Sequence, residues 1–281
     1  MAGDDSNVIS ISDSHWMVDG LLAHGEVSDV YFARRARWPT ELAVLKVLRD
    51  PDDGSLLESE WRALERLHRN PAVDGMNFAM RVPFSIVHGT AAGGNAGGLV
   101  GVYRWAQGFL HTFEAIRVAF PNGIAPPASI WIWRRILETL SVMGRAGLVH
   151  GAVLPNHLLI QEGEHGVRLV GFGCADLPGA HLRVVCSRFE HLYPTALLAS
   201  GELAQWVDIV MSARCIAYLL GGSAHDGEVP AHVPAPLAEI LRRCGSDTNS
   251  TVEDSWSLHQ ELGEIGRRLF GPPAFHPIVV G

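Results

Sequence analysis

The chain contains a single lysine, and its position suits the binding of a phosphate. Of the 22 residues that are lysine or arginine, only Lys46 is a lysine. Its ammonium group is a compact point charge, whereas the wide guanidinium fork of arginine does not fit a tight phosphate site. The apolar run of residues 41–48 predicts a strand around Lys46, and Glu60 lies farther along in a run with helical periodicity. These patterns place Lys46 on a strand and Glu60 on a helix. One interpretation of the two opposite charges is a structural ion pair that holds no nucleotide.

Several short segments around this pair follow one another in a fixed order. They are residues 22–31, which keep Gly25, and then residues 150–159, 171–173, 193–196 and 208–214. With Lys46 and Glu60 they resemble, in turn, the glycine-rich loop, catalytic loop, Asp-Phe-Gly motif, activation-segment end and central C-lobe helix of protein kinases. The resemblance, to eukaryotic-like Ser/Thr kinases, runs from about residue 22 to residue 270, and the order and spacing of the segments make it specific.

This resemblance implies an α+β fold with two lobes. A strand-rich N-lobe with one main helix is expected over residues 1–103, and a mostly helical C-lobe over residues 104–281. The boundary falls near Arg104, and the two lobes together form one kinase-like domain of about residues 20–271.

The hydrophobic pattern of the chain also changes, from strand-like in the first part to helical in the remainder. Alternating and β-rich runs predict strands within residues 9–49, 81–88 and 99–105, with one helix over residues 58–67. Helical periodicity then predicts a helix that follows Pro126 and has Ser129 as its cap. Further helices are predicted over residues 205–220, 236–244 and 256–270.

The catalytic positions of the kinase pattern are occupied by residues that cannot perform the chemistry. The resemblance places Ala152 where kinases have the aspartate that accepts the substrate proton. His157 and Gly171 stand where kinases have the asparagine and aspartate that hold magnesium, and magnesium requires hard oxygen ligands. Loss of a positioned base alone costs about 10²–10⁴ in rate. We therefore predict a pseudokinase, with no catalytic residue, no bound metal and no enzymatic activity.

Other positions of the kinase pattern are retained. The resemblance implies that His150, Phe172 and Leu64 belong to the apolar spine that joins the lobes, and that Asp208 accepts hydrogen bonds from the catalytic loop. It also implies a set of residues that would line a nucleotide cleft, namely Lys46, Glu60, Gly25, Val30, Val44 and Leu159. Val44 stands where kinases favour alanine, which would narrow that cleft. No cofactor is required, and any ATP is expected to bind without magnesium.

One further change concerns the end of the activation segment. Kinases pair a glutamate there with an arginine late in the C-lobe, and the corresponding positions here are Ala196 and Ser250. Replacement of both partners is nearly neutral for stability, whereas loss of one strands a buried charge at roughly 3–5 kcal/mol. The replacement of both partners therefore supports the resemblance to protein kinases.

Composition limits the partners and the compartment. The net charge of −8 and the absence of long basic runs argue against binding of nucleic acid. The four cysteines form no CxxC pair, which suits a reduced, cytoplasmic protein. The start of the chain has no signal-peptide pattern, and no apolar run is long enough to span a membrane.

The expected function is the binding of another protein, as a regulatory or scaffold module, with residues 174–194 as the surface for the contact. Two alternatives remain open. The first is a feebly active kinase, or another nucleotide transferase, in which Asp176 or Glu162 replaces a missing carboxylate. The second is a module that binds a small molecule other than ATP between the lobes.

Overall fold

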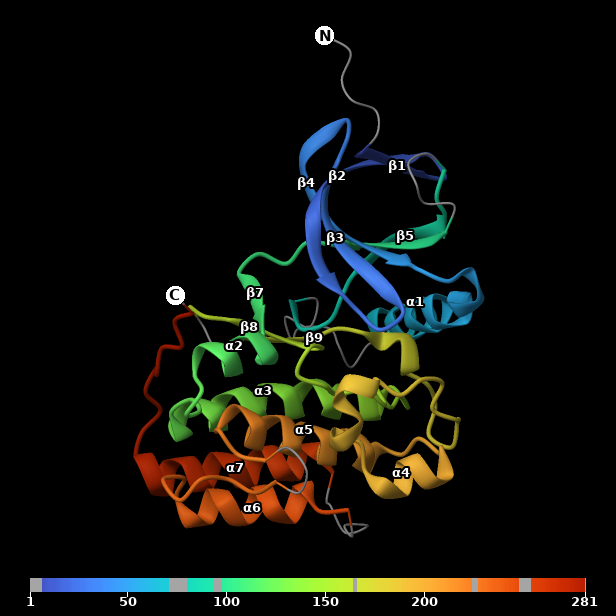
Figure 1. Ribbon diagram of the computed structural model, residues 1–281. Helices are drawn as coiled ribbons and strands as arrows, with labels where there is room; N and C mark the ends of the chain where they lie inside the picture. The colour runs from blue at the N-terminus through green and yellow to red at the C-terminus, as the bar shows by residue number, and fades with distance from the viewer. Residues whose placement is uncertain are drawn as a thin grey trace.

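The structure, a computed structural model, describes residues 7–70, 80–92, 98–163, 166–223, 227–247 and 254–280. A curled antiparallel sheet with one long helix forms the N-terminal part of the molecule, and helices dominate the remainder (Figure 1). This is the expected α+β arrangement with two lobes. Within these ranges no helix is both long and apolar enough to cross a bilayer.

The N-lobe sheet has six strands in the order β1-β2-β3-β4-β6-β5, and every neighbouring pair is antiparallel. The strands are β1 (Val8–Ile11), β2 (Ser14–His24), β3 (Ser28–Arg35), β4 (Trp38–Leu48), β5 (Ser85–Thr90) and β6 (Leu99–Arg104). The strand expected from residue 81 begins at Ser85 instead, because Pro83 has no N–H to donate to the ladder.

Alternation along β4 determines what faces the rest of the molecule. Ala43 and Leu45 are buried in a core within the curl of the sheet, together with Trp16. Because successive side chains of a strand point to opposite faces, Val44 and Lys46 face the other way, and Val44 packs against the core shared with the C-lobe. The sheet therefore presents Lys46 toward the helix below it.

That helix is α1 (Gly54–His68), which buries Leu57, Leu64 and Leu67. It begins four residues earlier than predicted, because the short helix η2 (Pro51–Asp53) leads directly into it. The Asp50 carboxylate caps η2 by accepting a hydrogen bond from the backbone N–H of Asp52 (2.9 Å).

The C-lobe contains a small antiparallel sheet and six α-helices among the residues described. The sheet has the order β7-β8-β9, with strands β7 (Phe109–Thr112), β8 (Leu158–Gln161) and β9 (Gly166–Leu169). The helices are α2 (Phe113–Ala119), α3 (Pro126–Arg145), α4 (Thr195–Ser200), α5 (Gln205–Leu219), α6 (Ala235–Gly245) and α7 (Ser255–Phe270). The small sheet lies nearest the N-lobe, and α6 and α7 lie farthest from it (Figure 1).

The prediction that Ser129 caps α3 is wrong. The N-cap is Ala125, because Pro126 and Pro127 already have helical backbone at the first two positions of the helix. Ser129 lies inside the first turn and donates its hydroxyl hydrogen to the carbonyl of Pro126 (2.8 Å). The four cysteines are buried, free thiols.

Candidate functional site

Lys46 and Glu60 form an ion pair between β4 and α1, as the sequence predicts. The Glu60 side chain is only 3% exposed and that of Lys46 only 17%, so the pair is largely withdrawn from water. Kinases have a corresponding ion pair between strand and helix, so the pair itself matches the kinase pattern.

Tyr103, which the sequence analysis did not identify, is a buried residue beside this pair. It stands opposite Val44 in the β4–β6 ladder, and its hydroxyl lies near Gly101. Burial, together with the nearby Glu60 carboxylate, raises the pKa of Tyr103 well above its usual value, so the hydroxyl stays protonated. Within the ranges described, its oxygen has no partner in hydrogen-bonding geometry.

His157 and Gly171 meet at the position where the kinase pattern would hold magnesium. Gly171 has a left-handed backbone (φ +79°), and a β-carbon built on it would come within 2.7 Å of the His157 ring. The His157 Nδ1–H donates to the Ala152 carbonyl oxygen (2.8 Å), which fixes the ring in this place. The imidazole therefore fills the volume that a side chain at position 171 would require.

His150 and His157 are both neutral near pH 7. Desolvation lowers the pKa of both rings, and that of His150 falls to about 3. The hydrogen bonds of His150 agree with a neutral ring, because Nδ1 accepts from the Ala152 N–H (3.2 Å) and Nε2 lies 3.1 Å from the Val170 carbonyl oxygen. No group of three or more His, Cys, Asp or Glu side chains able to hold a metal occurs in the described parts of the chain.

The four residues assigned to the structural framework are buried around the same loop. Phe172 packs edge-on against His150, with ring centroids 4.6 Å apart, and Leu64 of α1 lies in the same apolar core. Asp208 on α5 accepts hydrogen bonds from the backbone N–H groups of His150 (2.7 Å) and Gly151 (2.8 Å). Burial raises the pKa of Asp208 to about 7 despite these bonds.

The remaining residues expected in the cleft lie on β3, on β4 (Val44, described above), on β8 and in a turn. Val30 on β3 pairs with Lys46 in the sheet, and Leu159 on β8 lies on the face opposite the buried Leu158 and Ile160. Gly25 lies in the tight turn between β2 and β3, and its N–H donates to the Ser28 carbonyl oxygen (2.8 Å).

The turn that carries Gly25 is fastened to the C-lobe by Glu26. One Glu26 carboxylate oxygen accepts a hydrogen bond from the Ser187 hydroxyl (2.7 Å), and the other lies 3.7 Å from the Cys186 sulfur. The Arg49 guanidinium donates to the carbonyl oxygens of Gly25 and Glu26 from the other side. The partners lie 161 residues apart in the chain, so no local sequence signal indicates this latch.

The carboxylates of Asp176 and Glu162 are engaged away from the His157–Gly171 corner. Asp176 accepts hydrogen bonds from Arg183 (2.5 Å) and from the Leu177 N–H (2.8 Å). Glu162 accepts a hydrogen bond from the Val280 N–H (2.9 Å) and lies 3.3 Å from His111 Nε2.

A buried ion pair anchors the end of the segment at residues 193–196. Arg214 on α5, whose side chain is 1% exposed, donates to the Asp247 carboxylate (2.7 Å). Asp247 also accepts hydrogen bonds from the N–H (3.1 Å) and hydroxyl (3.0 Å) of Thr195. The sequence analysis did not predict this anchor. The prediction for positions 196 and 250 stays untested, because Ser250 lies outside the described residues.

Comparisons with known proteins support the fold. No protein-family model and no curated protein matches the chain. Among solved structures, the crystal structure of the BubR1 kinase domain is similar, with a TM-score of 0.68 at 12% sequence identity. The match covers 92% of this chain and 82% of that one. The protein therefore has a protein-kinase-like fold with a β-sheet N-lobe and a helical C-lobe.

Proposed function

We propose that this protein is a pseudokinase, which transfers no phosphate and acts by presenting its folded surface to another protein. The observation that carries the proposal is the mutual fit of His157 and Gly171. Where a kinase requires two metal-binding side chains, a neutral imidazole lies against a residue without a side chain. Phosphoryl transfer depends on metal ions and placed charges for most of its rate, and this corner supplies neither.

Two further features concern the cleft. The buried Tyr103 lies beside the Glu60 carboxylate, and Glu26 ties the glycine-rich turn to the C-lobe. A nucleotide that binds beneath the glycine-rich turn would have to displace the latch. Any ATP therefore binds weakly and gains little from magnesium.

A role in protein binding is supported by what remains intact. Asp208, His150 and Phe172 keep a buried, hydrogen-bonded framework, although the groups for catalysis are absent. A framework of this kind can keep a protein-binding surface in a fixed conformation. Residues 174–194 are our candidate surface, because loops on a rigid scaffold commonly carry binding residues. Arg188 stands out there, with a side chain 69% exposed.

The alternative of a transferase that uses displaced carboxylates has less support. Asp176 is held by Arg183, and Glu162 is held by the Val280 N–H. Either carboxylate would have to give up its hydrogen bond before it could bind a metal ion.

The proposal is tested by an assay with radiolabelled ATP and either magnesium or manganese, for autophosphorylation and for transfer to generic substrates. We expect no incorporation above a mock preparation. The control is the Lys46→Ala variant, because incorporation that disappears in this variant would show a working active site and overturn the proposal.

A further inference from the structure

A cavity of about 430 Å³ opens in the C-lobe between α3, α7 and the segment of residues 271–276 that follows α7. Pockets of roughly 300–1,000 Å³ suit small ligands. Two glycines of α7 bring the helices together here, because a β-carbon on Gly266 would lie 3.3 Å from Ile130 and one on Gly263 would lie 3.3 Å from the Arg134 guanidinium. The close approach of the helices places Arg134 directly over the helix surface at Gly263.

Two guanidinium groups line the cavity, and neither has an acidic partner. Arg134 donates its Nε–H to the His259 carbonyl oxygen (3.3 Å) and lies over the Trp131 ring, 5.2 Å from its centroid. Arg267 of α7, which is exposed, also lines the cavity. Neither arginine forms a salt bridge with any carboxylate in the described ranges, and Glu264, which is exposed, is the acidic residue of the lining. Desolvation lowers the pKa of Arg134, the Glu138 carboxylate acts in the opposite direction, and the positive charges of Arg135 and Arg267 lower the pKa further.

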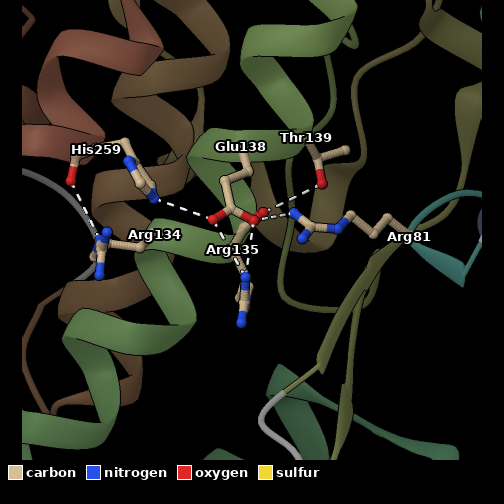
Figure 2. A network of polar contacts seen from close by, with 6 residues as sticks. All are labelled: Arg81, Arg134, Arg135, Glu138, Thr139 and His259. Carbon is tan, nitrogen blue, oxygen red and sulfur yellow. Dashed lines mark hydrogen bonds and ion pairs between the residues drawn. The ribbon is translucent and has the colours of Figure 1, made fainter. Parts of the chain in front are cut away.

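The largely withdrawn carboxylate of Glu138 already has other partners. Figure 2 shows Glu138 surrounded by Arg81, Arg135 and His259, while the hydrogen bond of Arg134 runs to the His259 backbone instead. Glu138 therefore balances three other groups. The cavity lining therefore carries two guanidinium groups and one carboxylate, that of Glu264, although the whole chain has a net charge of −8.

The other side of the cavity is aromatic. Trp256 is stacked on the His259 ring, with centroids 4.8 Å apart and planes 11° apart. Trp256 is still 40% exposed and Phe270 37% exposed, so ring surface remains for contact. His259 itself is 6% exposed, and its Nδ1 has no hydrogen-bond partner in the described structure, although Nε2 contacts Glu138 (3.1 Å). A buried polar atom without a partner is uncommon in proteins.

We propose that this cavity binds a small aromatic molecule that carries an anionic oxygen group, either a carboxylate or a phosphate. The planar guanidinium groups of Arg134 and Arg267 would hold the anion, because arginine matches both groups with paired N–H donors. The indole of Trp256 and the ring of Phe270 would cover the aromatic part. This ligand site is separate from the cleft between the lobes.

Calorimetry with three naphthalene probes tests the proposal on the intact chain. The probes are 2-naphthoate, 2-naphthyl phosphate and the uncharged 2-naphthamide. We expect saturable one-to-one binding of at least one anion, at least tenfold tighter than binding of the amide. The anion that binds with the higher affinity identifies whether the natural ligand carries a carboxylate or a phosphate.

Matched variants locate the site. Arg267→Gln is expected to weaken the anion at least fivefold, and Arg268→Gln, the exposed neighbour outside the cavity lining, less than twofold. Trp256→Ala is likewise expected to weaken binding, whereas Trp38→Ala, at an exposed tryptophan of the N-lobe, is not. The proposal is overturned if neither anion saturates, if the amide binds equally well, or if either control loses as much affinity as its partner.

Discussion

At the scale of single residues, the contact between His157 and Gly171 means that each position limits what the other can be. A side chain at 171 would collide with the imidazole, and the imidazole has its place only because 171 is glycine. Overpacking of this kind costs typically 1–3 kcal/mol. Reversal of one substitution alone is therefore expected to harm the fold rather than restore chemistry.

A double-mutant cycle measures this dependence. Gly171→Ala is expected to lower the free energy of unfolding by roughly 2 kcal/mol, and clearly less in the His157→Asn background, where the smaller side chain makes room. Denaturant unfolding provides the values. Gly179→Ala is the control, since Gly179 also has positive φ (+87°) but the nearest atom to its β-carbon is 3.9 Å away. A Gly171→Ala cost that is the same in both backgrounds would mean that the two positions do not interact.

The sequence predicts these positions but not their contact. The proposed loss of the metal ligands can be inferred from the sequence because a motif fixes where each residue is expected, as with Gly171. The sequence also predicts the Lys46–Glu60 pair, since a strand and a helix position its members. It gives no signal for Glu26 with Ser187, or for Arg214 with Asp247, because only the folded chain brings these residues together.

At the scale of elements, Glu138 joins α3 to α7 and to the start of the segment that leads into β5. Burial alone would raise the pKa of Glu138, but the hydrogen bond from His259 and the charges of Arg81 and Arg135 lower it to about 2. Between that value and the ordinary 4.5, the unfolded chain binds more protons than the folded chain. The contribution of Glu138 to stability is therefore present above pH 4.5 and is lost as the pH falls toward 2.

Thermal unfolding of Glu138→Gln at two pH values tests this linkage. At pH 6 the variant is expected to be less stable than the wild type, by on the order of 3 kcal/mol at most. The difference is expected to shrink at pH 3, because the wild-type carboxylate is then losing the advantage of its charge. Glu65→Gln is the control, since Glu65 pairs with Arg69 on the exposed face of α1, where ion pairs contribute little. A Glu138 effect that does not change with pH would contradict the assignment.

The segment of residues 174–194 carries the prediction about partners. Arg188→Glu is expected to weaken capture of a protein from native lysate, with little change in melting temperature, because its pair with Glu114 is exposed. Arg69→Glu reverses an equally exposed charge on α1 and is expected to leave capture intact. Asp208→Ala is expected instead to lower the melting temperature, since it leaves two buried N–H groups without partners. Equal loss of capture in the two charge-reversal variants would remove this segment as the binding surface.

Elements differ in how well the sequence predicts them. Long periodic helices such as α5 and α7 are found to within about one residue of their ends. The short helices α2 and α4 are missed, because one or two turns give too little periodicity. The cap of α3 is misplaced, because two prolines start that helix before the serine is reached.

At the scale of the whole molecule, the kinase-like fold surrounds a corner in which the His157 ring lies against Gly171. The sheet and α1 still meet the C-lobe at Phe172, and the turn with Gly25 is still held above the cleft, now by Glu26. The fold class follows from the sequence, because the change from alternating to helical periodicity spans the whole chain. The bond between Glu26 and Ser187 does not, since it joins segments of the two lobes that lie far apart in the chain.

The central claim is that this cleft no longer binds a nucleotide together with magnesium. Titration calorimetry with ATP, in the presence and absence of magnesium, tests it most directly, with Lys46→Ala to identify any binding at the cleft. We predict weak binding that changes less than threefold when magnesium is added, because His157 and Gly171 provide no oxygen ligand. A tenfold or greater gain in affinity on addition of magnesium, about 1.4 kcal/mol, would contradict the account.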